Sequence, residues 1–258
     1  MKATPPNPIG AIEKACRVLK AMSDGRNVRL VDIADYCGLD RSTTMRVLDI
    51  LIREGMVARD ADSRHYRLGA EIVRIANGVE EEIDWRAVAR PSLLRLSGEF
   101  GDTSLMSVLS GLEMVCADLQ IGEYPVRANF QALGSRRTLG VGSSGLAVLG
   151  AMRDPEREAV LAQIAPRVTH YPMLTDTFLR EAIARVQENG YAVLIDAVVH
   201  RMGGIAAAIR SPDGEVIAAV AISALSERIL ERETELATAV KKEAAAIEVA
   251  LARAKTRV

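Results

Sequence analysis

Residues 140–145 read GVGSSG, which matches the G-x-G-x-x-G pattern that cradles a pyrophosphate in dinucleotide-binding folds. That fingerprint needs a strand running straight into its first glycine and a carboxylate about 20 residues later, at the end of the next strand. The preceding SRRTL is too polar and short for a buried strand, and residues 163–175 contain no Asp or Glu. The pattern therefore does not predict a dinucleotide, and no other cofactor is expected.

The same glycine-rich turn still has chemistry to offer, because it opens a predicted helix. A helix start presents unpaired backbone N–H groups and the positive end of the helix dipole, which together favour a carboxylate or a phosphate. Ser143 and Ser144 stand at this start, and Arg137 could add a bidentate contact to a carboxylate. A solvated surface pair is the competing interpretation of Arg136 and Arg137.

Catalysis by Ser143 is the second chemistry to weigh. A nucleophile elbow reads G-x-S-x-G, whereas the frame around Ser143 reads VGSSG and lacks the first glycine. His170 and His200 lie downstream, so a serine hydrolase stays an alternative, but the spacing supports no Asp–His pairing. We expect no catalytic residue and no enzyme.

A third group of residues suits contact with DNA. Steps of about 100° along residues 41–55 place Thr44 and four apolar side chains on one side of a helix, the latter being Val47, Leu48, Leu51 and Ile52. The polar face carries hydroxyls and cations, with Ile50 as its one apolar residue: Ser42, Thr43, Arg46 and Arg53, after Arg41 at the helix start. Such a face can hydrogen-bond phosphates and base edges in the major groove.

Neighbouring elements would position that helix. Residues 12–25 have helical spacing of apolar side chains (Ile12, Ala15, Cys16, Leu19, Met22) and close at Gly25, and residues 30–37 form a second helix that ends at Gly38. Asp40 then caps the third helix, which gives a helix-turn-helix. Residues 56–60 and 64–69 alternate as two short strands, so a β-hairpin follows and completes a winged helix. The hairpin carries cations suited to the DNA backbone or minor groove: Arg59, Arg64, His65 and Arg67.

Charge is divided along the chain. Residues 1–69 hold 12 Lys/Arg against 9 Asp/Glu, whereas the remainder holds 21 against 25, which is compatible with nucleic-acid contact at one end only. No apolar run approaches the roughly 20 residues of a membrane span, and the N-terminus has no apolar signal core, so we expect a cytoplasmic protein without membrane contact. Cys16, Cys37 and Cys116 are widely spaced and read as buried thiols, so no metal site is expected.

The run from residue 12 to residue 69, with LVDIADYCGLDRSTTMRVLDILIREG at its centre, resembles the DNA-binding domain of IclR-type transcriptional regulators. The resemblance implies that Ser42, Thr43 and Arg46 belong to the recognition helix. It also implies that residues 70–84, a helical stretch, link the two domains and help to pair two subunits. The acidic residues Glu80 to Glu82 fit a solvated helix face better than a metal site.

Beyond residue 84 the pattern mixes antiparallel strands with peripheral helices, which indicates an α+β class rather than a doubly wound sheet. Helices are expected over 85–100, 146–152, 156–164, 175–189 and 227–254. Strands are expected over 103–109, 113–121, 190–196, 204–211 and 215–223, with a hairpin turn at Pro212-Asp213-Gly214. The chain thus divides into a winged helix (1–69), a linker helix (70–84) and a larger domain (85–258).

The segments TLGVGSSGLAVLGAM and GYAVLIDAVVHRMGGIAAAIRSPDGEVIAAVAIS resemble the effector domain of the same family, a GAF-like sheet with helices that binds a small molecule. The resemblance places pocket backbone donors at Ser143 and Ser144. Further pocket positions that it implies are Val126, Asn129, Arg137, Leu194, Met202, Gly204, Ala221 and Ser223.

Several residues depart from that family pattern. The family's loop usually reads Thr-Ala-x-Gly-Lys-Ala, whereas residues 142–147 read GSSGLA, without the lysine and with two hydroxyls. An acidic family position is Leu194 here, and Asp196 is the nearest carboxylate on the same strand face. We expect a small organic acid, aromatic acids included, held by Ser143, Ser144 and Ser223 with Arg137 or His200 assisting.

These patterns together predict a ligand-responsive regulator. The partners would be a double-stranded DNA operator, a small carboxylate effector and a second copy of the chain, as a homodimer or as a tetramer built from two dimers. A ligand that binds one arrangement of the dimer better would shift operator affinity by linkage. A regulator that binds DNA constitutively, with a larger domain that only dimerises, is the alternative.

Overall fold

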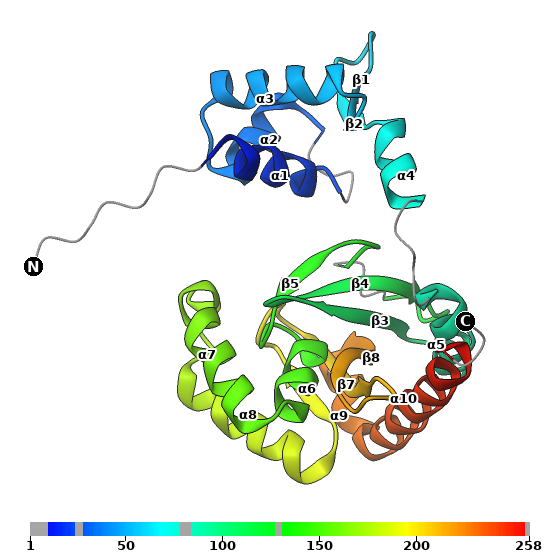
Figure 1. Cartoon of the computed structure of the whole chain (residues 1–258). Coiled ribbons are helices and arrows are strands. Elements are labelled where there is room, and N and C mark those ends of the chain that lie inside the picture. The colour runs from blue at the N-terminus through cyan, green and yellow to red at the C-terminus, as the bar shows by residue number, and fades with distance from the viewer. Residues whose placement is uncertain (1–9, 24–27, 78–83, 127–130, 256–258) are drawn as a thin grey trace, which may run out of the picture. The chain divides into compact units, whose positions relative to one another are not determined.

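A computed structural model describes residues 10–23, 28–77, 84–126 and 131–255 (Figure 1). The chain divides into two compact units, Met1–Glu81 and Glu82–Val258, and each unit has buried hydrophobic clusters of its own. No helix in the described part of the chain is both long enough and apolar enough to cross a membrane.

Three helices build the first unit: α1 (Ala11–Ala21), α2 (Leu30–Cys37) and α3 (Arg41–Arg53). Their apolar stripes meet in one core, in which Val18, Ile33 and Leu48 are fully buried. Of the expected apolar face of α1, Met22 is buried and Ala15 and Leu19 are partly buried. The other two buried positions, Val18 and Ala21, are not part of that expected face. Ile12 is 83% exposed, and Cys16 is exposed rather than a buried thiol. The expected stop at Gly25 lies outside the described residues.

A two-stranded hairpin follows α3, as the alternation of residues 56–69 predicts. Strands β1 (Val57–Arg59) and β2 (Tyr66–Leu68) pair antiparallel, with Arg59 opposite Tyr66. Val57 and the Tyr66 ring are buried in the helical core, so the hairpin is fixed to the helices. Helix α4 (Ala70–Asn77) comes next, and the rest of the expected linker helix up to residue 83 lies outside the described residues.

The second unit is built on an antiparallel sheet of six strands, in the order β5-β4-β3-β8-β7-β6. Their bounds are β3 (Thr103–Ser110), β4 (Glu113–Gln120), β5 (Arg136–Thr138), β6 (Ala192–Ile195), β7 (Met202–Arg210) and β8 (Val216–Leu225). The turn between β7 and β8 is the predicted one, with Gly214 at a φ of 86°. The mixed, antiparallel architecture confirms the α+β class.

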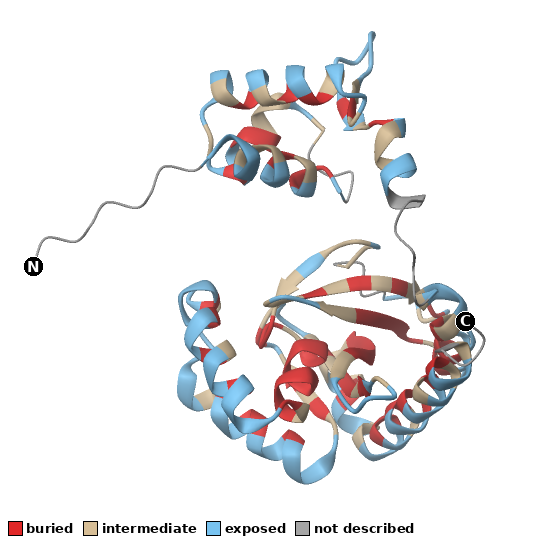
Figure 2. Cartoon of the chain, viewed as in Figure 1, coloured by how far each residue is buried: buried red, intermediate tan, exposed pale blue. Residues whose placement is uncertain are grey.

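Helices cover both faces of this sheet (Figure 1). One face packs against α6 (Ser143–Ala151), α7 (Asp154–Val168) and α8 (Asp176–Asn189), and the other against α5 (Trp85–Phe100), α9 (Ser226–Glu231) and α10 (Glu233–Lys255). Buried residues accordingly line the strands and the inward sides of these helices, while the outward sides are exposed (Figure 2).

Three local features differ from the expected elements. Strand β5 is not among the strands that the sequence predicts, because RRT is short and polar, but it needs only one partner, β4, at the edge of the sheet. The single helix expected over residues 227–254 is divided at Arg232, whose φ of −122° is not helical. A register shift between Met106 and Ser107 of β3 marks a β-bulge in β4 opposite.

Candidate functional site

The start of α3 is fixed by Asp40. Its Oδ1 accepts hydrogen bonds from the backbone N–H of Thr43 (2.8 Å) and the hydroxyl of Ser42 (2.7 Å). These bonds hold the pKa of the Asp40 carboxyl well below its usual range, because they stabilise the carboxylate. The expected cap is therefore present, and it also orients Ser42.

The outward face of α3 holds the residues expected for DNA contact. Arg41, Ser42, Arg46 and Arg53 are exposed, and Thr43 is partly buried. The Arg46 guanidinium lies 3.5 Å from the Thr43 hydroxyl, so these two side chains form one polar patch. Two apolar side chains share the exposed surface of this helix: Met45, which sequence reasoning overlooked, and Ile50.

Three further cations project from the hairpin. Arg59 stacks on the Tyr66 ring with 5.1 Å between guanidinium carbon and ring centroid, and its Nε donates to the Arg64 carbonyl (3.4 Å). Arg64 has a φ of 58°, so it occupies the tight part of the turn. Arg59, Arg64 and Arg67 are all exposed, which leaves them available to phosphates.

A pocket opens in the second unit between the start of α6 and the sheet. It has about 640 Å³ of space free of atoms, with the open mouth included. Eight of the twelve residues expected to bind an effector line it: Arg137, Ser143, Ser144, Leu194, Met202, Gly204, Ala221 and Ser223. Residues from several strands, one helix and the loops between them thus meet at one place.

The start of α6 forms the polar wall of this pocket. Gly142 is its N-cap and has no side chain to bond the first amides of the helix. A Cβ on Gly142 would lie 3.7 Å from Nη1 of Arg137, so the guanidinium lies beside the helix start. A Cβ on Gly204 would lie 2.6 Å from the Ser143 hydroxyl, so a side chain at this position of β7 would force that hydroxyl to move.

None of the other four expected residues is among the described residues that line the pocket. Asp196 follows β6 with a φ of 56°, is exposed, and accepts a hydrogen bond from the Ser226 hydroxyl at 2.7 Å. This turn overrides the strand alternation that placed it on the face of Leu194. His200 is exposed in the next turn and does not line the pocket. Asn129 lies outside the described residues, and Val126 is exposed away from the pocket lining.

Other lining residues were missed by sequence reasoning. Ser107 and Cys116 come from paired positions of β3 and β4, and Gln131 and Ser135 come from the loop before β5. Strand pairing at the bulge decides which side chains of β3 and β4 face the pocket, and the residue pattern does not reveal that bulge.

The Cys116 thiol is held neutral. Burial raises its pKa to about 11, with a further contribution from the Asp118 carboxylate and a partly opposing one from Arg137. A neutral thiol is a poor nucleophile and metal ligand. Among the described residues, no three or more His, Cys, Asp or Glu side chains gather as a metal site.

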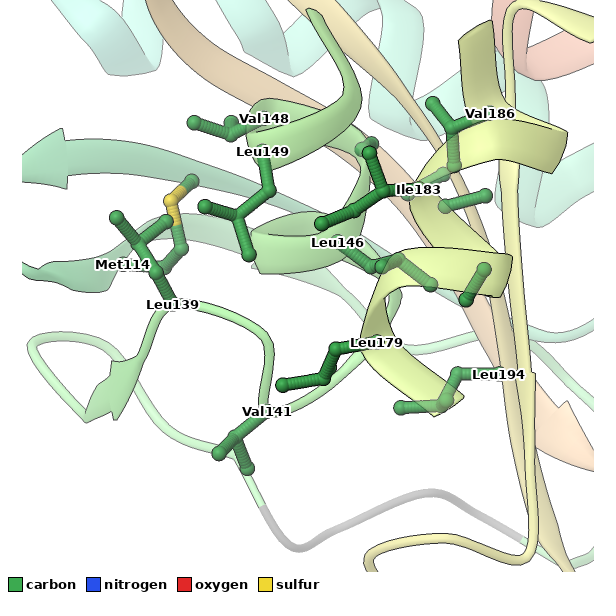
Figure 3. Close-up of a cluster of buried hydrophobic side chains, with 14 of the residues drawn as sticks. Met114, Leu139, Val141, Leu146, Val148, Leu149, Leu179, Ile183, Val186 and Leu194 are labelled. Atoms are coloured by element: carbon green, nitrogen blue, oxygen red, sulfur yellow. The ribbon is translucent and has the colours of Figure 1, made fainter. Parts of the chain in front are cut away.

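Apolar packing holds α6 in place behind the pocket. Leu146 and Leu149 of α6 lie in one buried cluster with Leu179 and Ile183 of α8 (Figure 3). Val141 and Leu194 belong to the same cluster and also line the pocket. Leu146 and Leu149 are at most 1% exposed. Rigid packing of this kind keeps the helix start, and hence its amides, in a fixed position.

A winged helix with an exposed basic face, in a chain whose second unit carries a small-molecule pocket, defines a class of protein: a DNA-binding transcriptional regulator with an effector domain. Comparison with known families specifies the class further. The model of the IclR helix-turn-helix domain matches residues 11–61, and that of the bacterial transcriptional regulator IclR C-terminal domain matches residues 78–249. The chain belongs to the IclR family, whose members are transcriptional regulators and not enzymes, so the serine hydrolase alternative is wrong.

Individual relatives align along most of the chain. The HTH-type transcriptional regulator Rv1719 of Mycobacterium tuberculosis is 31% identical over 226 residues, which cover 86% of this chain and 84% of the relative. The transcriptional repressor IclR of Escherichia coli is 29% identical over 254 residues, covering 94% and 90%. A solved IclR homolog from Microbacterium hydrocarbonoxydans, in complex with 4-hydroxybenzoate, is 26% identical with a TM-score of 0.75, covering 95% of this chain and all of that one.

Proposed function

We propose that this regulator senses a small organic acid, which binds in the pocket beside α6 and changes the affinity of the protein for its operator. One observation carries the proposal: the uncapped start of α6 and the Arg137 side chain lie together at the pocket wall. Both favour a negative charge, the first through its amides and dipole and the second through its guanidinium.

The rest of the lining suits the apolar body of such an acid. Leu105, Met114, Val141, Leu194 and Met202 surround the polar wall, and a pocket that is mostly apolar with a few placed polar groups is typical of small-molecule sites. Aromatic acids are first candidates, because the related Microbacterium protein was solved with 4-hydroxybenzoate. Ser143, Ser144, Ser223 and Arg137 are proposed as the polar contacts.

For the DNA side, we propose that α3 enters the major groove. Ser42, Thr43 and Arg46 then read base edges, while Arg41, Arg53, Arg59, Arg64 and Arg67 contact phosphates or the minor groove. The exposure of the arginines supports this division. The proposed domain borders are 1–69, 70–84 and 85–258, and the proposed assembly is a dimer or a tetramer. Ligand binding then acts by linkage on the pair of winged helices.

Calorimetry on the full chain tests the effector. Benzoate, 4-hydroxybenzoate and aliphatic carboxylates are titrated into the wild type, into Ser144→Leu and into Ser110→Leu, a matched change at an exposed residue outside the pocket. We expect an acid to bind the wild type and Ser110→Leu, and Ser144→Leu to lose at least tenfold in affinity. The proposal fails if none of the acids binds or if Ser144→Leu binds as the wild type does.

A second experiment separates ligand sensing from constitutive DNA binding. Duplexes selected from a random pool serve as operator, and affinity is measured with and without the bound acid. A change in affinity supports the switch. If the acid binds and operator affinity never changes, the constitutive alternative is correct. Light scattering of the same samples measures whether the chain is a monomer, a dimer or a tetramer.

A further inference from the structure

The pocket wall contains a polar atom that the protein leaves without a hydrogen bond. Among the buried side-chain oxygen and nitrogen atoms of the described residues, Oε1 of Gln131 and Oδ2 of Asp118 have no partner. The Asp118 carboxylate is bonded through its other oxygen to Arg90 of α5. Gln131 differs, because it lines the pocket.

The position of Gln131 is held by the neighbouring strand. The turn that follows it is bonded to both backbone groups of Cys116: the Cys116 N–H donates to the Ser135 carbonyl (3.0 Å), and the Gly134 N–H donates to the Cys116 carbonyl (2.8 Å). The Ala132 N–H also donates to the Ser135 hydroxyl (3.3 Å). The turn next to Gln131 is therefore fixed to β4, and the Gln131 amide lies at this edge of the pocket.

A buried amide oxygen without a hydrogen bond is unfavourable unless a donor binds to it. Leaving such a group unsatisfied destabilises the protein, and buried polar groups in proteins almost always have a partner. An amide oxygen only accepts hydrogen bonds, so its partner must be a donor. An ionised carboxylate only accepts, so the acid group of the effector cannot be that partner.

We propose that Gln131 is a specificity-determining residue, and that it selects acids that also carry a hydroxyl or amino donor. The proposal rests on the proposed function, because the acid group is assigned to the α6 wall and the donor to the Gln131 wall. Ser107 and Cys116 line the same pocket and make the surroundings of such a donor polar rather than purely apolar. An acid without the donor would leave the Gln131 oxygen unsatisfied in the complex as well.

Matched ligands test this selection on the wild-type chain. Calorimetry compares benzoate with its three monohydroxy and three monoamino isomers, and with the corresponding fluoro and methoxy acids, which add bulk or an acceptor but no donor. We expect at least one hydroxy or amino isomer to bind about tenfold more tightly than benzoate and than its own fluoro and methoxy counterparts.

A variant ties the preference to Gln131. Gln131→Met keeps the approximate length of the side chain and removes the acceptor, so the preference over benzoate should fall from about tenfold to about one. Gln163→Met, at an exposed residue of α7 outside the pocket, is the matched control and should keep the preference. Circular dichroism verifies the fold of the variant. If the variant does not fold, the ligand comparison on the wild type alone tests the proposal.

The outcomes separate the two proposals. If no acid binds the wild type, the proposed function is wrong. If acids bind and the hydroxy and amino isomers gain nothing over benzoate, or gain as much as the methoxy acids, the role of Gln131 is wrong and the proposed function stands. A preference that survives Gln131→Met assigns the donor to another residue and also overturns the inference.

Discussion

Cys116 and Asp118 lie two residues apart on β4, yet their side chains face opposite sides of the sheet. Cys116 pairs with Ser107 and lines the pocket, whereas Asp118 pairs with Met106, which belongs to the core under α5 and α10. The bulge between these two pairs accounts for the reversal, because one extra residue in β4 exchanges the faces of all residues beyond it. The part of β4 that lines the pocket and the part that faces α5 are therefore separated only by this bulge.

Asp118→Ala should destabilise the second unit. The carboxylate is fully buried and accepts from Arg90 Nη2 (2.7 Å) and from the Leu119 N–H (2.9 Å). Its removal leaves Nη2 of Arg90 and the Leu119 N–H without this acceptor, and we expect the free energy of unfolding to fall by about 3 kcal/mol. Urea titration followed by the fluorescence of Trp85, the single tryptophan, measures the loss. An unchanged midpoint would show that the pair contributes nothing.

The three thiols should differ in reactivity in the order of their exposure. Burial raises the pKa of Cys37 and raises that of Cys116 to about 11, so near pH 8 only about one Cys116 thiol in a thousand is ionised. Cys16 is exposed. Iodoacetamide at pH 8 should therefore label Cys16 first, as measured by mass spectrometry of peptides.

The same shift has a consequence for stability at high pH. Because the folded protein raises the Cys116 pKa, the neutral thiol contributes stability below pH 9, and this contribution is lost as the pH rises towards 11. Cys116→Ala should weaken the decline in thermal stability between pH 9 and pH 11. Rapid labelling of Cys116 at pH 8 in the folded protein would contradict the assignment.

Much of the winged helix could be predicted because its determinants are local. Asp40 at the N-cap, Gly38 at the end of α2 and the alternation around Tyr66 act within a few residues of the chain. The pocket was predictable only in part. The family resemblance predicts Ser143, Gly204 and Ser223 as pocket residues. The positions of Ser107, Cys116 and Gln131 in the pocket depend instead on strand register and on hydrogen bonds between β4 and a loop that is distant in sequence.

Two of the misplaced pocket residues, Asp196 and His200, have a common physical cause. Asp196 and Arg201 both adopt positive φ, at 56° and 62°, and so the chain between β6 and β7, which carries His200, turns away from regular strand geometry. Period-two alternation, on which the placement of Asp196 depended, applies only within a strand. Neither residue with positive φ is a glycine, and the sequence therefore carried no local sign of the left-handed backbone.

Gly204→Ala should weaken effector binding without unfolding the protein. The new methyl would lie 2.6 Å from the Ser143 hydroxyl and displace the start of α6. We expect roughly a tenfold loss of affinity for the bound acid by calorimetry, because a small displacement of positioned amides weakens the contact. Because Ser143 is itself a proposed contact, Gly204→Ala is also measured in a Ser143→Ala chain, where the clashing oxygen is absent and the same substitution should cost less affinity. An equal cost in both chains would place the effect elsewhere in β7.

Protonation of the Asp40 carboxylate in acid should destabilise helix α3. Hydrogen bonds from Thr43 and Ser42 lower the pKa of this carboxyl, so the stability it contributes is present above its unfolded pKa of about 4 and is lost as the pH falls below that value. Hydrogen exchange of peptides covering α3 should accelerate from pH 5 to pH 2.5, after correction for intrinsic rates. Asp40→Asn keeps a capping oxygen that does not titrate, and its α3 should show a smaller acceleration. Equal acceleration in both proteins would contradict the role of the cap.

Arg46 and Arg64 should affect DNA binding in different ways, because one lies on the recognition helix and the other in the hairpin turn. Arg46→Ala should weaken binding to the selected operator by about 1–3 kcal/mol and relax its sequence preference. Arg64→Ala should weaken specific and non-specific binding alike and reduce the slope of log affinity against log salt by about 0.9. Fluorescence anisotropy at four salt concentrations measures both quantities.

Arg253→Ala, at an exposed arginine of α10, is the matched control and should leave them unchanged. If Arg46→Ala changes only the salt slope, α3 contacts phosphates rather than bases, and the division proposed between helix and hairpin is wrong.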